Sequence, residues 1–199
     1  MFLISKPCAW ADDLIKFPTG PAAWTVSVTR KAPASPPTAG HPGNTSVVFT
    51  SVAVTQDDHF RRTVITYSSG AARESWSIPN LNLFLMEDPG GTVFITHRDP
   101  DPFGPGAFSW IKSEFLKDKN PVIFQSHKCF HYQGDVIDPY VGPITHEAWI
   151  DSSTLLPVAL DDGTELGVFT PQQPSGSSLT PPAKFNKIVI NAKKAMGVQ

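Results

Sequence analysis

The sequence of 199 residues is poor in charge and in cysteine, and it has no long apolar run. Charged residues make up 17%, against about a quarter in an average globular protein. The formal net charge of −2 and the lack of a large Lys/Arg cluster argue against binding to nucleic acid. No apolar run approaches the ~18 residues that a membrane-spanning helix needs. The chain is therefore expected to be globular, without a nucleic-acid partner and without a transmembrane span.

The signatures of common enzyme classes are missing as well. The sequence has no Gly-x-Ser-x-Gly motif of esterases, no phosphate-binding P-loop and no Gly-x-Gly-x-x-Gly motif after a strand. Three pairs of carboxylates lie in turn-forming or proline-rich stretches: Asp57 with Asp58, Asp99 with Asp101, and Asp161 with Asp162. We interpret them as turn residues and solvated charge, because a calcium loop needs further oxygen ligands at fixed spacing. The sequence predicts a protein without enzymatic activity and without a cofactor.

The amino-terminal segment has a feature of exported proteins. Ala9-Trp10-Ala11 matches the small-x-small pattern that signal peptidase cuts, so the mature protein is predicted to begin at Asp12. The apolar stretch Met1 to Ile4 is shorter than a complete signal, and residues 1–11 are interpreted as a signal-peptide remnant. A chance match at a frayed terminus is the alternative. Removal of this segment leaves Cys129 as the only cysteine and excludes an intramolecular disulfide. We expect a periplasmic or secreted bacterial protein.

Alternation of apolar and polar residues, the period of a half-buried strand, dominates the remainder. The stretch WTVSVTR at 24–30 shows it clearly. Further strands are predicted within 46–56, 59–79 (a hairpin turning near 68–70), 92–96, 122–125, 128–136, 146–151 and 156–170 (a hairpin turning at Asp161-Asp162-Gly163). A Pro/Gly-rich stretch at 31–46 is expected to be a surface loop. Residues 12–199 are therefore predicted to form a single β-rich domain.

Two stretches have the apolar spacing of a helix. Residues 108–121 carry the stripe Trp110, Ile111, Phe115 and Leu116 and end at Asn120-Pro121. Residues 179–196 carry the stripe Phe185, Ile188 and Val189 after two prolines suited to a first turn. No strand–helix–strand alternation is found, which argues against a parallel sheet. The predicted fold class is α+β and β-rich, with a curved antiparallel sheet, a short internal helix and a carboxy-terminal helix packed on one face.

The stretch HKCFHYQGDV places His127, Cys129 and His131 on one side of a strand, and Phe130 and Tyr132 on the other. Neighbours on one side are about 7 Å apart, and the two histidines about 13 Å. Two of the three polar side chains can meet on one zinc ion, but all three cannot do so from a regular strand. A metal site would need further ligands, for which the candidates are His97, His146, Glu147 and Asp135.

A nucleophilic Cys129, paired with His131 or His146, is another alternative for this stretch. A reactive thiol needs a lowered pKa, usually from a helix N-terminus or a positive neighbour, and a mid-strand position supplies neither. We interpret the stretch as an ordinary strand in which Cys129 is buried as a small hydrophobic residue. No metal ligand is assigned on this interpretation.

Large aromatic residues recur on the predicted strands and are the candidates for binding a ligand. They are Trp24, Phe49, Phe60, Trp76, Phe94, Phe124, Trp149 and Phe169. In one interpretation they pack the core beneath the terminal helix. In the other, some of them line an apolar cavity between the sheet and the helices. Both interpretations need the same side chains on the same face, so the sequence leaves them open.

The carboxy-terminal half resembles a family of exported bacterial proteins. The motif residues are Phe130-His131-Tyr132-Gln133-Gly134, Trp149-Ile150-Asp151, Leu156-Pro157-Val158 and Pro182-Ala183-Lys184-Phe185. They are similar to the pattern of the periplasmic lipoprotein carriers LolA and LolB and their uncharacterised relatives. The resemblance implies a LolA-like half-barrel, an unclosed barrel whose concave side, covered by helices, holds an acyl chain or another apolar ligand. The amino-terminal half departs from the pattern, so lipoprotein transport itself is not inferred.

Three classes of function are compatible with these features. The first is a non-enzymatic envelope protein that binds a lipid or other apolar ligand in a half-barrel. The second is a structural or interaction protein with a filled core, an exposed apolar patch and another envelope protein as its partner. The third is a hydrolase or metal protein centred on His127, Cys129 and His131. A contiguous apolar cavity would favour the first class. Convergence of two of these three residues with His97, His146 or a carboxylate would favour the third.

Overall fold

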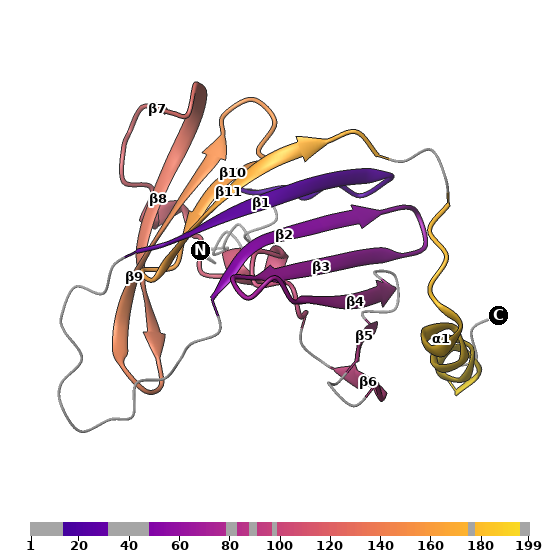
Figure 1. Ribbon diagram of the computed structural model, residues 1–199. Helices are drawn as coiled ribbons and strands as arrows, with labels where there is room; N and C mark the ends of the chain where they lie inside the picture. The colour runs from indigo at the N-terminus through magenta and orange to yellow at the C-terminus, as the bar shows by residue number, and fades with distance from the viewer. Residues whose placement is uncertain are drawn as a thin grey trace, which may run out of the picture. The chain divides into compact units, whose positions relative to one another are not determined.

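The computed structural model describes residues 14–31, 48–78, 83–87, 91–96, 99–174 and 178–195. In this part of the chain, strands alternate with turns and one α-helix follows near the carboxy terminus (Figure 1). The elements are β1 Ala22–Arg30, β2 Phe49–Gln56, β3 Arg61–Tyr67, β4 Ala72–Ile78, β5 Leu83–Glu87, β6 Val93–Thr96, the 3₁₀ helices Pro105–Phe108 and Ser113–Phe115, β7 Val122–Phe124, β8 His127–Asp138, β9 Gly142–Asp151, β10 Pro157–Asp161, β11 Glu165–Gln172 and α1 Ala183–Ala195. The predicted signal-peptide remnant, the loop 31–46 from residue 32 onward, and His97 lie outside the described residues.

The strands are hydrogen-bonded into one antiparallel sheet in the order β6-β5-β4-β3-β2-β1-β11-β10-β9-β8-β7. Nearly all neighbours in the sheet are also neighbours in the sequence, as short connections require. Because β6 and β7 are edges and do not pair, the sheet is open. This order confirms the predicted β-rich, antiparallel class with a carboxy-terminal helix.

The contacts divide the chain into two compact units. The first, named the β8–β9 unit, contains residues 14–17, 29–31 and 105–168. The second, named the α1 unit, contains the described residues within 18–28, 48–104 and 169–195. Strands β1 and β11 contribute residues to both units. The single domain expected from the sequence therefore remains a prediction.

The β8–β9 unit is built on a long hairpin. Strands β8 and β9 pair in unbroken register from Cys129 opposite Asp151 to the turn. One face of the hairpin is covered by the segment before β7, and Gly134 permits the close approach. A Cβ atom at Gly134 would lie 3.0 Å from the ring of Phe115 and 3.2 Å from the ring of Trp110. This covered face is the core of the unit.

The internal helix predicted for residues 108–121 is wrong. The region contains the short 3₁₀ helix Ser113–Phe115, and its second half runs beside β8 instead. Leu116 forms a β-bridge to Tyr132. The N–H of Lys117 donates to the carbonyl of His131 over 2.9 Å. Pairing with an existing strand satisfies these backbone groups, so tertiary structure overrides the helical spacing of the apolar residues.

In the α1 unit, strands β1 to β6 each pair with the next along the chain. The hairpin predicted to turn near 68–70 is confirmed, with Gly70 at a φ of 82°. Strand β5 was not predicted. Its run of Leu, Phe and Met contains no β-branched residue and is not typical of a strand. Pairing with both β4 and β6 stabilises it as one.

The predicted terminal helix is confirmed as α1, which begins directly after Pro181 and Pro182. Phe185 and Val189, four residues apart on one face, are buried against the sheet. The approach to the helix is fixed by the N–H of Leu179, which donates to the Asp57 carboxylate over 2.7 Å. Of the helices that the structure describes, none is long and apolar enough to cross a bilayer.

Candidate functional site

The aromatic residues predicted to bind a ligand are distributed among separate clusters. Trp24, Phe49, Phe60, Trp76, Phe94 and Phe169 belong to the α1 unit, and Phe124 and Trp149 to the β8–β9 unit. Most of them contact another aromatic ring. Phe94, on the edge strand β6, is instead 40% exposed. A ligand-binding surface formed by these aromatic residues would therefore lie within a single cluster.

α1 covers an apolar cluster on the sheet. Its buried members are Trp76, Ile78, Leu83, Leu85, Phe185 and Val189. Its margin consists of partly buried apolar side chains, namely Phe60, Val93, Leu179 and Ile188. The ring of Trp76 lies at the centre, with centroids 6.4 Å from those of both Phe60 and Phe185. Apolar surface thus continues from the buried centre to the margin between helix and sheet.

A polar group fixes the orientation of Trp76. Its indole N–H donates to Glu74 over 2.6 Å, and Arg62 donates to the other oxygen of the same carboxylate over 2.7 Å. Burial acts to raise the pKa of Glu74, but the hydrogen bonds from Arg62 and Trp76 outweigh it, so the pKa is lowered. The carboxylate therefore stays ionised at neutral pH and holds the indole edge at the rim of the cluster.

A second aromatic cluster in the α1 unit is tightly packed around Phe103. Its ring makes edge-to-face contacts with Phe49 and Phe169 at centroid distances of 6.2 and 6.3 Å. Phe103 is almost completely buried. Edge-to-face packing of this kind fills space. Phe169 is thus a core residue of this cluster, and Phe49 packs against it from a partly buried position.

A buried ion cluster in the α1 unit was missed by the sequence analysis. The guanidinium of Arg61 pairs with the carboxylate of Asp101 and, over 3.1 Å, with that of Asp99. It also lies 5.6 Å from the ring of Trp24. The interpretation of Asp99 and Asp101 as solvated charge is wrong, because Asp101 is buried and Asp99 is largely so.

Each charge of the Arg61–Asp101 pair stabilises the other, so removing either one leaves a buried, uncompensated charge. Burial raises the pKa of Asp101, while the Arg61 charge and the N–H of Phe103 oppose this rise. Two buried donors, Nε of Arg61 and Nε1 of Trp24, make no hydrogen bond. The sequence signal for this cluster was weak, since the ion pair joins residues 40 positions apart.

The three polar residues of HKCFHYQGDV form separate contacts. His127 Nδ1 lies 3.6 Å from Asp151, whereas His131 Nδ1 donates to Asp118 over 3.0 Å. Cys129, between them, directs its Sγ to the carbonyl of His127 at 3.6 Å. Over the residues that the structure describes, no group of three or more His, Cys, Asp or Glu is placed to hold a metal ion.

The further ligands considered for a metal site are also separated. His146 is the register partner of Gly134, so its side chain lies on the covered face, opposite to His131. Burial lowers the pKa of His146, against the opposing charges of Asp162 and Asp161. Asp135 accepts a hydrogen bond from Thr145 on the adjacent strand. Of the candidates within the described chain, Glu147 alone approaches His131.

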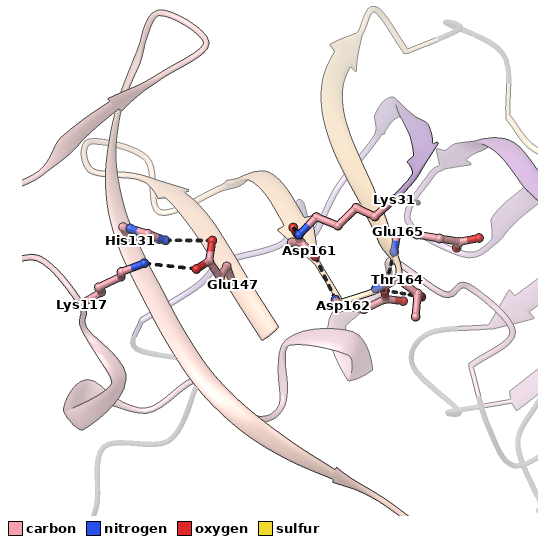
Figure 2. Close-up of polar contacts among 9 residues, drawn as sticks. Lys31, Lys117, His131, Glu147, Asp161, Asp162, Thr164 and Glu165 are labelled. Atoms are coloured by element: carbon pink, nitrogen blue, oxygen red, sulfur yellow. Dashed lines mark hydrogen bonds and ion pairs between the residues drawn. The ribbon is translucent and has the colours of Figure 1, made fainter. Parts of the chain in front are cut away.

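His131 is the centre of a polar and aromatic group on the outer face of β8 and β9. Figure 2 shows Glu147 between His131 and Lys117, at 3.6 Å from His131 Nε2 and 3.2 Å from the lysine. The imidazole stacks on Trp149 at 4.8 Å, and Trp149 stacks in turn on Phe124 at 4.5 Å. A hydrogen bond to Asp118 and the stack on Trp149 thus fix His131, while its buried Nε2 lies near Glu147 without a hydrogen bond. Strand pairing of Leu116 is what brings Lys117 and Asp118 to this group.

The carboxylate pair at the β10–β11 turn divides into two roles. Asp162 accepts from the backbone N–H groups of Thr164 and Glu165, as a turn residue does (Figure 2). Asp161 is buried and paired with Lys31, so its interpretation as solvated charge is wrong. It is also the register partner of Glu147, and two carboxylates face each other across β9 and β10. Each of the two has its own lysine, which offsets the repulsion.

Cys129 is expected to be chemically inert in the folded protein. Burial raises its pKa to about 11, and the charge of Asp151 contributes to the rise. At pH 8 about one thiol in a thousand is then ionised, and only the thiolate is nucleophilic. In a Cys8→Ser background, iodoacetamide should alkylate the folded protein more than about 100-fold more slowly than the unfolded protein. Equal rates would mean that the thiol is exposed and activated.

Compared with known proteins, the sequence matches no family model and no curated protein at a significant level. The similarity to LolA and LolB rests on the motif residues alone and stays a prediction.

Proposed function

We propose that the protein is a non-enzymatic binding protein that holds a lipid-like or other apolar ligand beneath α1. The observation that supports this best is the cluster around Trp76, whose apolar surface reaches from a buried centre to a partly exposed margin. Contact between helix and sheet depends on two fully buried helix side chains, Phe185 and Val189. An apolar chain that enters at the margin would lie against both the helix and the sheet.

The energetics of this arrangement favour an apolar ligand. Burial of apolar surface contributes roughly 25 cal/mol for each Å² removed from water. The ion pair between Lys184 and Glu87, which also joins α1 to the sheet, is partly exposed and contributes little. A ligand that enters at the margin would replace apolar contacts between helix and sheet, and no β-ladder would have to break, because α1 pairs with no strand.

The half-barrel arrangement and the location in the bacterial envelope are part of this proposal. They are supported by the motif residues shared with LolA and LolB and by the signal-peptidase pattern Ala9-Trp10-Ala11. A hydrolase centred on Cys129 receives less support, because the thiol is protonated at neutral pH and His131 is hydrogen-bonded to Asp118. Lipoproteins themselves are not required as ligands.

A fluorescent fatty acid tests the proposal. A dansyl-labelled undecanoic acid should bind the purified full-length chain with a blue-shifted, enhanced emission, because its acyl chain and dye leave water. In the variant Ile188→Asp, a charge at the margin of the cluster should weaken binding at least about ten-fold, since burying an uncompensated carboxylate is costly.

The matched control is Ile190→Asp, which puts the same charge on the same helix. Ile190 is 58% exposed and is no part of the cluster, so its replacement should leave the affinity for the probe unchanged. No binding to the wild type, or equal losses in the two variants, would contradict a site beneath α1.

A further inference from the structure

β8 has an open side near its turn with β9. Strand β7 pairs with β8 only over His127–Cys129, and Leu116 adds one bridge at Tyr132. Beyond Tyr132, residues 133–138 have β9 as their one neighbouring strand in the part of the chain that the structure describes. Figure 1 shows β7 at the end of β8 that lies away from the β8–β9 turn. The last half of β8 is therefore an edge.

The backbone of this edge is oriented for pairing. In an antiparallel ladder, the N–H and C=O of one residue point to the same side. The carbonyl of His131 accepts from Lys117 and so points away from β9. By alternation, the backbone groups of Asp135 and Ile137 point the same way. No strand of the described chain lies opposite these two residues.

Large apolar side chains are exposed beside the open edge. Ile137 is 73% exposed, and Tyr140 and Val141 in the adjoining turn are 94% and 72% exposed. Single exposed apolar residues are ordinary, but here three occur within five positions at the tip of one hairpin. An apolar edge strand of this kind is a template for another strand unless it is protected.

The charge carried by the open edge itself is negative. Residues 133–138 include Asp135 and Asp138 and no Lys or Arg, whereas the carboxylate of Glu147 on β9 is already paired with Lys117. Lysine is the usual protection of an edge strand, and residues 133–138 lack it. Asp135 is exposed on the same face as Ile137. The edge thus combines open backbone groups, apolar side chains and negative charge.

We propose that an extended segment of a partner protein, in which Lys or Arg alternates with apolar residues, adds as a strand to β8 at residues 133–138. Hydrogen bonds to the main chain would supply the affinity, and alternate side chains the specificity. A cation of the segment lies opposite Asp135, and an apolar residue lies opposite Ile137. A ligand beneath α1 is not needed for this contact.

A second copy of the chain is a poorer occupant of the edge. Self-pairing of two β8 strands would bring two acidic hairpins together, with Asp135 and Asp138 of both copies in one short ladder. Like charges across a pair of strands are destabilising. A basic segment removes this repulsion and replaces it with attraction.

Two synthetic peptides test the proposal with the full-length chain. Both are blocked at their ends, carry fluorescein and alternate a charged residue with valine over eight positions. One uses lysine and the other glutamate. By fluorescence anisotropy at low ionic strength, the Lys/Val peptide should bind at least ten-fold more tightly than the Glu/Val peptide. Equal affinities, or no binding of the Lys/Val peptide, would overturn the proposal.

Variants of the edge locate the contact. Asp135→Pro removes an outward N–H while leaving the ladder with β9 intact, and should weaken binding of the Lys/Val peptide at least ten-fold. Ile137→Lys places a like charge beside the Lys/Val peptide and should weaken its binding to a similar extent. If thermal melting shows that Asp135→Pro is unfolded, the binding measured for Ile137→Lys decides the test. Glu165→Gln, which removes a charge of the same unit on β11, with β10 and β9 between it and β8 in the sheet, should bind as the wild type does.

Two outcomes would contradict the proposal, one on where the peptide binds and one on which molecule occupies the edge of β8. Wild-type affinity in the folded edge variants would place the peptide elsewhere. A wild-type dimer in sedimentation, converted to monomer by Asp135→Pro, would show that a second copy occupies the edge.

Discussion

Replacing Arg61 by alanine is expected to lower the free energy of unfolding by about 3–5 kcal/mol, the usual result of removing one partner of a buried ion pair. The guanidinium is the cation that neutralises the buried carboxylate of Asp101, and it also pairs with Asp99. Without the guanidinium, the carboxylate of Asp101 stays buried but loses the positive charge that stabilises its ionised form. Chemical denaturation at pH 7, followed by tryptophan fluorescence, measures the difference.

The adjacent residue provides the control. Arg62→Ala removes a half-exposed side chain whose partner Glu74 is also partly exposed, and should cost at most about 1 kcal/mol. Adding Asp101→Asn to Arg61→Ala should restore part of the stability, because the uncompensated charge is gone. Similar small losses in Arg61→Ala and Arg62→Ala would show that the Arg61 cluster is not buried.

The loss caused by Arg61→Ala should depend on pH. Burial raises the pKa of Asp101 above its ordinary value of 3.8, and Arg61 opposes this rise. In the variant the folded carboxyl therefore binds a proton more readily than the unfolded one. The protonated Asp101 carboxyl then contributes to the free energy of unfolding at acid pH, and this contribution is lost as the pH rises through its folded pKa. The deficit should be smaller at pH 4 than at pH 7.

Replacing Phe185 by alanine is expected to cost a further large amount, about 3–5 kcal/mol in a denaturant melt. Its ring is 1% exposed and is one of the two side chains by which α1 enters the cluster around Trp76. The variant leaves a cavity beneath the helix, and the tryptophan emission should shift to longer wavelength as water reaches the indole.

Ile190→Ala, on the exposed side of the same helix, should change the stability by less than about 0.5 kcal/mol. A loss below about 1 kcal/mol for Phe185→Ala would mean that α1 is not docked on the sheet, and the proposed ligand site would lose one of its walls.

The strands could be predicted because their information is local. Alternation in β1 and β3 follows from burial on one side of a sheet, and the Asp-Gly signal gives the β10–β11 turn. At this turn Gly163 has a φ of 87°, and a Cβ atom there would lie 2.4 Å from Ile144. Both the backbone conformation and the lack of space therefore require glycine at position 163, and the Asp-Gly pair makes this requirement visible in the sequence.

The errors arose where distant residues decide the structure. The segment 108–121 has a helical stripe, but Leu116 pairs with Tyr132 of β8, and no local pattern reveals that competition. The burial of Asp101, which lies in no strand, likewise depends on Arg61 in β3. The regular rise of a strand correctly predicted that His127 and His131 are too far apart to share a site. It did not reveal their carboxylate partners, which lie on other segments.

The most direct test of the central claim is native mass spectrometry of the full-length chain, isolated from a bacterial envelope extract without delipidation. A site beneath α1 predicts one bound apolar molecule per wild-type chain, depleted in Ile188→Asp and retained in Ile190→Asp. A wild-type chain that carries no such molecule, and takes none up on incubation with bacterial phospholipids, would contradict it.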